Sequence, residues 1–384
     1  MSSLPPSTLR VNHHTQPLPR TIRPGAEVRA FHRRLPGYVV TPLHDVPALA
    51  ATCKVGRVLV KDESSRLGLP SFKIVGASWA VYRVLCERLG GEPVWERLAD
   101  LAAVVAERLG RLRLVAATDG NHGRAVAHMA RLLGLDATIF VPDDMAVARI
   151  AGIESEGAEV VVVPGDYDDA VAESAGMASD VDLVVSDTSW PGYEDPPRCV
   201  IEGYSTIFAE VEEQLAELGL ARVDAAVVPV GVGALAAAAA QSLRAGVQPG
   251  EGPLLVGVEP ADSACVAAAV AAGHVVDVPG PHRSVMAGLN CGLASMLALP
   301  TVRAAYDAFV AVPDERARVA LQAMADTGMD VGETGAAALA GLMAVVEDHR
   351  TEMPLPEDAT VLLIATEGVT DPQGFAEIVG RPPR

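Results

Sequence analysis

One lysine in a lysine-poor chain is the first residue whose type points to chemistry. The sequence has 30 lysine and arginine residues, and only Lys54, Lys61 and Lys73 among them are lysine. Lys73 follows Ser71 and Phe72 directly before a helical run. A partly buried lysine can lose its proton and form a Schiff base with an aldehyde, whereas a guanidinium with a pKa above ~12 cannot. The positive end of a helix dipole is expected to lower the pKa of Lys73. The alternative is a solvated surface charge.

A second candidate is the stretch Ala-Thr-Asp-Gly-Asn-His-Gly at residues 117–123, between a predicted strand and a predicted helix. Its two glycines permit a close approach of the backbone to a ligand. The amide of Asn121 can donate a hydrogen bond to a ligand oxygen. The alternative is a tight turn in which Asp119 caps the helix. His122 is interpreted as a packing or hydrogen-bonding residue.

The third candidate is Gly231-Val232-Gly233-Ala234, between a predicted strand and an alanine-rich helix. Successive backbone N–H groups at a helix start form an anion site. Dinucleotide binding is disfavoured, because position 236 is alanine and no strand ends in an acid about 20 residues further on. A single phosphate group is the better ligand.

Two further loops follow predicted strands. Asp187 opens one of them, and Trp190 and Tyr193 come shortly after it. Thr366 opens the other, in Thr-Glu-Gly. Each is also compatible with an ordinary loop or turn.

The order of these signals is more specific than any one of them. An aldehyde-binding lysine, an amide-bearing turn, a phosphate loop and a late hydroxyl are the groups that pyridoxal 5′-phosphate requires. The lysine would bind its aldehyde and the amide its 3′-oxygen. The loop would bind its phosphate and the hydroxyl its ring nitrogen. The sequence therefore predicts a site for this cofactor.

Short apolar runs that alternate with longer helical runs must position these residues. Expected strands include 58–60, 112–117, 225–230 and 360–365. Near-continuous apolar strands between helices indicate an α/β fold with largely parallel sheets covered by helices. The candidate motifs all follow strands, where such sheets bind ligands.

The expected organisation is a loose N-terminal arm and two lobes. The arm covers residues 1–25. Residues 26–104 and 190–384 are expected to form a large lobe, and residues 105–189 a small inserted lobe. Each lobe is predicted to contain a largely parallel, twisted sheet covered by helices.

Bulk composition excludes several classes of partner. The net charge of −19 argues against nucleic acids and anionic membranes. The most apolar stretch, 225–240, is too short and too broken to span a membrane. The first 24 residues lack an apolar secretory core, so a cytoplasmic location is expected.

With these motifs in place, the chain resembles the fold-type II, or tryptophan synthase β-like, pyridoxal-phosphate enzymes. Within that family it is most similar to the diaminopropionate ammonia-lyases. The resemblance rests on motifs at 61–64, 72–73, 117–124, 187–194, 231–234, 258–260, 286–292, 332–333 and 366–368. Threonine and serine dehydratases carry a small residue where Asp119 stands, and an acid there together with Asp187 distinguishes the diaminopropionate enzymes.

The resemblance implies a role for each motif. Lys73 would hold the cofactor and Asn121 would face its 3′-oxygen. Gly231 to Ala234 would bind the phosphate, and Thr366 would lie beside the ring nitrogen.

The resemblance also implies which residues bind the substrate and act on it. Asp119 and Asp187 would lie near a substrate β-amino group, and Lys73 or Asp119 would remove the α-proton. Less specific candidates for the substrate pocket are Ser71, Thr118, His122, Tyr193 and Glu333.

The predicted function is therefore β-elimination of 2,3-diaminopropionate to pyruvate and ammonia. By resemblance, the protein is expected to be a homodimer that acts on a small amino acid. Cys265 and Cys291 are expected to approach each other as reduced thiols, and no metal is expected.

Two alternative functions stay open. One is another β-elimination or β-replacement, such as serine or threonine dehydration or a biosynthetic step. The other is a non-catalytic protein that binds the cofactor.

Overall fold

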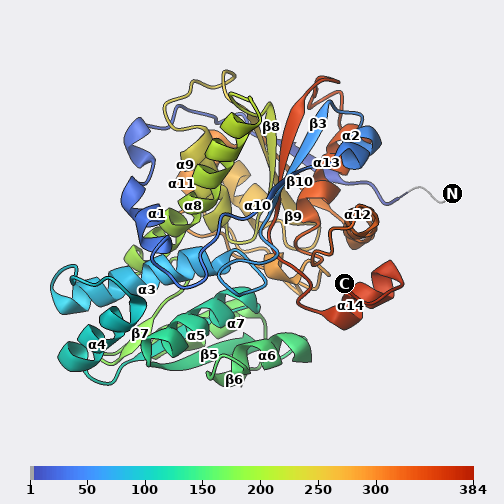
Figure 1. Cartoon of the computed structure of the whole chain (residues 1–384). Coiled ribbons are helices and arrows are strands. Elements are labelled where there is room, and N and C mark those ends of the chain that lie inside the picture. Colours follow the sequence, from blue (N-terminus) through green and yellow to red (C-terminus); the bar gives the residue numbers. More distant parts are fainter. Residues whose placement is uncertain (1–3) are drawn as a thin grey trace. The chain divides into compact units, whose positions relative to one another are not determined.

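The computed structural model describes residues 4–384, which separate into two compact units (Figure 1). Each unit is built around its own β-sheet. The larger unit comprises Met1–Pro24, Val40–Ser65 and Ile207–Arg384, and the smaller unit comprises Gly25–Val39 and Arg66–Thr206.

The strands follow in chain order: β1 (Thr8–Val11), β2 (Leu43–Asp45), β3 (Arg57–Asp62), β4 (Arg113–Ala117), β5 (Asp136–Pro142), β6 (Glu159–Val163), β7 (Asp182–Val184), β8 (Ala225–Pro229), β9 (Leu254–Pro260), β10 (Ala308–Val312) and β11 (Thr360–Ala365). The α-helices are α1 (Ala26–His32), α2 (Pro47–Cys53), α3 (Lys73–Leu89), α4 (Leu98–Leu109), α5 (Asn121–Leu133), α6 (Val147–Glu154), α7 (Tyr167–Gly176), α8 (Asp195–Glu217), α9 (Ala234–Leu243), α10 (Cys265–Ala272), α11 (Leu299–Ala305), α12 (Asp314–Asp326), α13 (Ala337–Asp348) and α14 (Pro372–Val379). Two 3₁₀ turns lie at Arg20–Ile22 and Ala287–Leu289.

The sheet of the larger unit has seven strands in the order β1-β10-β9-β8-β11-β3-β2. Its five central strands pair in parallel, and the edge strands β1 and β2 are antiparallel to their neighbours. Helices cover both faces (Figure 1). On one face α13 packs with α2 and α12 over alternate strand residues such as Val58, Val227 and Leu363. The predicted strands at 58–60, 225–230 and 360–365 are confirmed, and so is the α/β class.

The sheet of the smaller unit has four strands in the order β6-β5-β4-β7, all parallel. From β4 the chain runs outward through β5 and β6, and then returns to place β7 on the other side of β4. The crevice beyond the carboxyl ends of β4 and β7 is therefore a topological switch point, where sheets of this kind bind ligands.

The N-terminal segment is not the loose arm expected from its composition. Thr8–Val11 forms the edge strand β1 and pairs with β10. The side chain of Asn12 then donates hydrogen bonds to the carbonyl oxygens of Arg303 and Tyr306 at 2.8 and 2.7 Å. Pairing with β10 satisfies backbone groups that a free arm would leave to water. Residues 1–3 of the predicted arm lie outside the described part of the chain.

Two helices bear directly on the site described below. α3 begins at Lys73 itself and ends at Leu89, and the next residue, Gly90, adopts the left-handed conformation common after helices. α8 begins at Asp195. Two prolines follow Asp195, and the first turn of a helix tolerates proline because its N–H groups have no partner there. Within residues 4–384, no helix is long and apolar enough to cross a membrane.

Candidate active site

Lys73 forms an ion pair with Asp187 in the smaller unit. Its Nζ atom donates a hydrogen bond to Asp187 Oδ2 at 2.5 Å. Lys73 is the first residue of α3, and Asp187 lies in the loop after β7, at the switch point. The side chain of Lys73 keeps 17% of its surface exposed, whereas that of Asp187 keeps 5%. The amine is thus fixed in position and still accessible.

The charges of this pair shift both pKa values. Burial alone would lower the pKa of Lys73, but the negative charges of Asp187 and Asp119 outweigh burial and raise it well above its ordinary value. The expected lowering by the helix dipole is therefore wrong, because an ion pair at 2.5 Å is stronger than the partial charge at a helix end. Burial would raise the pKa of Asp187, but Lys73 and His122 hold it well below its usual range.

The turn between β4 and α5 is fixed by a threonine. Thr118 Oγ1 accepts hydrogen bonds from the backbone N–H groups of Gly120 and Gly123, both at 2.9 Å. Thr118 therefore shapes the turn, and no substrate contact is needed to explain it. Asn121 opens α5 and is half-buried, as is Asp119.

His122 ties this turn to the Asp187 loop. Its Nε2 atom lies 2.8 Å from the carbonyl oxygen of Val185, so Nε2 carries a proton and donates it. Its Nδ1 atom lies 3.9 Å from Asp187 Oδ2. The prediction that His122 serves hydrogen bonding agrees with this geometry.

Tyr193 holds the Asp187 loop in shape. Its hydroxyl donates to the carbonyl oxygen of Val184 at 2.8 Å and accepts from the N–H of Ser186 at 2.9 Å. Its ring stacks on Trp190, with the centroids 4.1 Å apart. This hydroxyl is committed to the backbone, so Tyr193 acts on the position of Asp187.

Sequence reasoning missed two tyrosines in this unit. Tyr167, the first residue of α7, donates from its hydroxyl to Asp187 Oδ1 at 3.1 Å. Tyr204, in α8, packs its ring on Phe72, with the centroids 4.7 Å apart. Neither tyrosine belongs to a motif, because each is brought near Lys73 only by the packing of its helix.

The larger unit contains the glycine loop. Gly231 to Gly233 follows β8, and Gly233 adopts φ +104° directly before α9. That positive φ favours glycine, since a side chain there would be strained. The backbone N–H groups at the start of this ten-residue helix are therefore presented as an anion site.

Thr366 lies at the same edge of that sheet, because β11 is parallel to β8 and adjacent to it. A chain of contacts links the two loops. Thr366 Oγ1 donates to the carbonyl oxygen of Thr334 at 3.3 Å, and Thr334 Oγ1 accepts from the N–H of Gly288 at 3.1 Å. The carbonyl oxygen of Gly288 lies 3.3 Å from where a Cβ atom on Gly231 would stand. A side chain on Gly231 would crowd this contact.

The other predicted residues are buried. Ser71 precedes α3 and is 2% exposed, and Glu333 lies beside Thr334 and is 5% exposed. Cys265 and Cys291 lie on either side of Gly231. Cys265 Sγ is 3.8 Å from the Gly231 carbonyl oxygen, and Cys291 Sγ is 3.5 Å from a Cβ placed on Gly231. Among the described residues, neither cysteine forms a disulfide bond.

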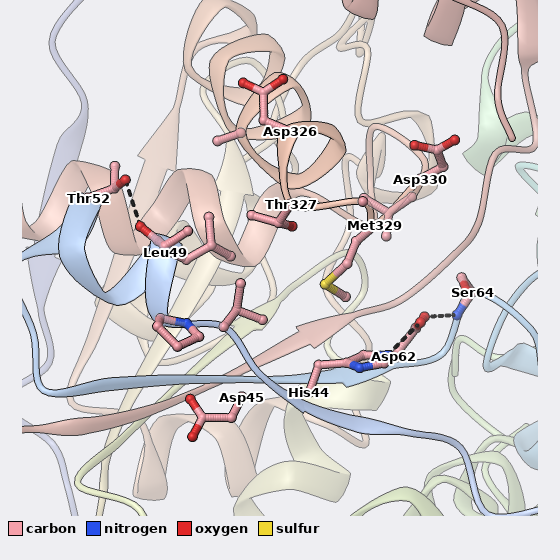
Figure 2. Close-up of a pocket in the computed structure, with 16 residues that line it drawn as sticks. His44, Asp45, Leu49, Thr52, Asp62, Ser64, Asp326, Thr327, Met329 and Asp330 are labelled. Atoms are coloured by element: carbon pink, nitrogen blue, oxygen red, sulfur yellow. Dashed lines mark hydrogen bonds and ion pairs between the residues drawn. The ribbon is translucent and has the colours of Figure 1, made fainter.

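The larger unit also has a cavity of about 790 Å³ that contains none of the predicted residues (Figure 2). Asp62 lies in its lining, where it accepts from the N–H of Ser64 at 2.9 Å and pairs with His44 at 3.4 Å. Asp45 and Asp330 are likewise paired, with Arg57 and Arg381. The acidic lining is thus largely neutralised by its neighbours.

Comparison with known families identifies the class of protein. The family model described as "Pyridoxal-phosphate dependent enzyme" matches residues 35–367. The chain belongs to this family, and its cofactor is pyridoxal 5′-phosphate. Its fold is that of the fold-type II members.

Within the family, the chain is similar over nearly its whole length to diaminopropionate ammonia-lyases. The chain is 34% identical over 370 residues to the diaminopropionate ammonia-lyase of Salmonella typhimurium, covering 92% of this chain and 91% of the relative. It is also 34% identical over 363 residues to that of Escherichia coli, covering 91% and 90%. The crystal structure of the holo Escherichia coli enzyme superimposes with a TM-score of 0.90 at 30% identity, covering 98% of both chains.

The residues present fit the cofactor. In the smaller unit an accessible lysine amine meets the need for an aldehyde partner. In the larger unit a glycine turn at a helix start meets the need for a phosphate cradle, and a buried threonine hydroxyl shares its sheet edge. When bound, pyridoxal phosphate withdraws electrons from the α-carbon of an attached amino acid, which acidifies the α-proton and lets a β-substituent leave.

Proposed function

We propose that this protein eliminates ammonia from 2,3-diaminopropionate, so that one pyruvate and two ammonia molecules are formed with the uptake of one water. The similarity to diaminopropionate ammonia-lyases over nine-tenths of the chain supports this substrate. The observation that carries the proposal is the pair of carboxylates around one lysine. Asp187 binds Lys73 Nζ directly, and the charge of Asp119 also acts on that amine.

The carboxylates account for a substrate with two amino groups. Lys73 Nζ shows that this pocket holds an ammonium group against Asp187. With Lys73 committed to holding the cofactor, Asp187 would be available to a substrate β-ammonium in place of the lysine ammonium. A hydroxyl substrate brings no charge, and leaving buried carboxylates unpaired is costly. Serine is therefore expected to be a poor substrate.

The chain's own residues would then move the protons. We propose that Lys73 Nζ or the Asp119 carboxylate takes the α-proton, according to the enantiomer bound. Asp187 holds the β-amino nitrogen as an ammonium, the form in which it leaves as ammonia. Tyr167, by donating to Asp187 Oδ1, keeps that carboxylate oriented.

We propose further roles for the remaining predicted residues. Asn121 would bind the 3′-oxygen of the cofactor, Gly231 to Ala234 would bind its phosphate, and Thr366 would meet its ring nitrogen. Ser71 and Glu333 serve the substrate pocket. A hydroxyl beside the ring nitrogen leaves it largely unprotonated, which suits a fast elimination.

The organisation of the protein is also proposed. The predicted small lobe at 105–189 forms the centre of the smaller unit, and residues 66–104 cluster with it. We propose a homodimer, which sedimentation of the purified protein would test. A cytoplasmic location is supported by the five cysteines, because none forms a disulfide bond among residues 4–384, which suits a reducing compartment.

The experiment is a substrate panel on the purified holoenzyme. Pyruvate release is measured with both enantiomers of 2,3-diaminopropionate, with serine and with threonine. The proposal expects diaminopropionate to give the highest kcat/KM. Equal or faster turnover of serine would replace the proposed function with a dehydratase, and no turnover by protein with bound cofactor would indicate a non-catalytic role.

A further inference from the structure

Tyr204 is held beside the first turn of α3 by a close helix crossing. A Cβ atom on Gly76 of α3 would stand 2.4 Å from Tyr204 Cε1 and 2.8 Å from Cζ. A Cβ atom on Gly203 of α8 would stand 2.4 Å from the carbonyl oxygen of Val75. Real Cβ atoms do not approach so closely, so Gly76 leaves the space that the hydroxyl end of the Tyr204 ring fills, and Gly203 lets the two helices come together.

This position puts the phenol and the lysine amine against the same ring. Tyr204 packs on Phe72 at a centroid distance of 4.7 Å, and Lys73 Nζ lies 5.7 Å from the centroid of the same ring. Tyr204 is fully buried. Among residues 4–384, its hydroxyl has no hydrogen-bond partner.

A buried hydroxyl without a partner is costly to a protein, and phenylalanine would avoid the cost. The hydroxyl is also a neutral donor. Burial raises the pKa of Tyr204, Lys73 acts against that rise, and Asp187 and Asp119 add to it. The phenol therefore keeps its proton throughout the working pH range.

We propose that Tyr204 is a positioning residue whose hydroxyl donates a hydrogen bond to Lys73 Nζ when that amine is neutral. A charged lysine has three N–H donors and no acceptor, and it pairs with Asp187 as seen in the structure. A neutral amine has a lone pair, and it is the form that attacks an aldehyde or takes up a proton. Tyr204 would stabilise that form and so lower the pKa of Lys73. This role deepens the proposed function, since it concerns the same lysine.

The test measures cofactor uptake, which is independent of diaminopropionate turnover. Cofactor-free protein is mixed with pyridoxal phosphate, and the rate of Schiff-base formation is followed by absorbance over a range of pH. The titratable groups around the amine are Asp187, Asp119 and Tyr204, with His122 and Tyr167 facing Asp187. The variant Tyr204→Phe removes only the phenol hydroxyl and leaves the other titratable groups in place.

Tyr204→Phe is expected to move the midpoint of this pH dependence upward and to slow uptake roughly tenfold at pH 7, as the loss of one hydrogen bond to the neutral amine requires. The melting temperature of the cofactor-free protein should stay the same or rise, because an unpaired buried hydroxyl is removed.

The matched control is Tyr306→Phe in the larger unit. Tyr306 is also fully buried, its hydroxyl has no partner within residues 4–384, and its ring packs on Phe309. It should leave the pH dependence of uptake unchanged.

A second variant tests the same role without removing the hydroxyl. Site-specific 3-fluorotyrosine at position 204 makes the phenol a stronger donor and should move the midpoint downward. The proposal is overturned if Tyr204→Phe and Tyr306→Phe share the wild-type midpoint, or if 3-fluorotyrosine leaves the midpoint unmoved. Failure of pyruvate release, with these shifts present, would reject the substrate and leave Tyr204 in its role.

Discussion

Asp187, in the loop after β7, and Lys73, at the start of α3, form an ion pair of 2.5 Å in the smaller unit. The contact exists because β7 lies next to β4, which brings the loop after β7 to the crevice where α3 begins. This pair sets the charge of the lysine on which the proposed chemistry depends.

Removing the carboxylate of Asp187 should weaken the protein and change the charge of Lys73. Asp187→Asn leaves a largely buried ammonium without its partner, so the free energy of unfolding of the cofactor-free protein should fall by roughly 3 kcal/mol at pH 7. The pKa of Lys73 should also fall. Urea unfolding measures the first effect, and Asp195→Asn, at an exposed carboxylate, is the control.

The pH dependence of this stabilisation has a definite sign. The pKa of Asp187 in the folded protein lies below its ordinary value of 3.8. Its stabilisation is therefore complete above that value and is lost as the pH falls through the folded pKa. Asp187→Asn should make unfolding less sensitive to acid. An unchanged acid dependence would mean that the pair contributes nothing to folding.

Exchange of Asp119 should change substrate choice. Asp119→Ser removes one of the two carboxylates assigned to the β-ammonium, so the ratio of kcat/KM for diaminopropionate to that for serine should fall by roughly 100-fold or more. Steady-state assays of pyruvate release give both values. A ratio that stays at the wild-type level would remove Asp119 from substrate recognition.

The crossing of α3 and α8 should tolerate no added methyl group. In Gly203→Ala the new Cβ would meet the Val75 carbonyl oxygen at 2.4 Å. Because that atom is backbone, the helices must separate, at a cost of roughly 1–3 kcal/mol or more. Gly176→Ala in α7 is the control, since nothing lies within 4 Å of its Cβ and alanine is the better helix former. In thermal unfolding, the melting temperature of Gly203→Ala should lie below that of the wild type and that of Gly176→Ala above it.

Glu259 should make the protein less stable at alkaline pH. It is fully buried and accepts hydrogen bonds from the N–H groups of Val266 and Ala267 in α10. Burial raises its pKa from 4.5 to about 8, against the effect of those bonds. The folded protein then binds more protons than the unfolded chain between these values, so stability falls as the pH rises through that window.

Glu259→Gln is the variant that checks this. It keeps the shape of the side chain without a titrating group, so its unfolding free energy should change less between pH 5 and pH 8 than that of the wild type. If Glu259 were ionised at both pH values, the unfolding free energies of the wild type and Glu259→Gln would change by the same amount between them.

Much of the fold followed from patterns that are local in sequence. The alternation of apolar strands and helices predicted the α/β class, and Lys73 was expected at a helix start, where α3 begins. The glycine turn before α9 was likewise visible, because its residue types and its place after a strand suffice. The edge strand at Thr8–Val11 was missed, since four residues carry too short a pattern.

What could not be predicted depends on contacts between distant elements. The approach of Asp187 to Lys73 follows from the order of strands in the smaller sheet, which no local pattern specifies. The direction of the pKa shift of Lys73 was wrong for this reason. Tyr167 and Tyr204 reach the site through helix packing, and neither lies in a recognisable motif.

The assignment of Lys73 as the cofactor-binding residue can be tested most directly by chemical trapping. The holoenzyme is reduced with borohydride, digested and examined by mass spectrometry for a pyridoxyl adduct. The chain offers three lysines. Lys54 is exposed, whereas Lys61 is fully buried and donates to Glu210 at 2.8 Å. The account predicts one adduct, on the peptide that contains Lys73, and its loss in Lys73→Ala. An adduct on Lys54 or Lys61, or an unmodified Lys73 in protein that retains the cofactor, would contradict it.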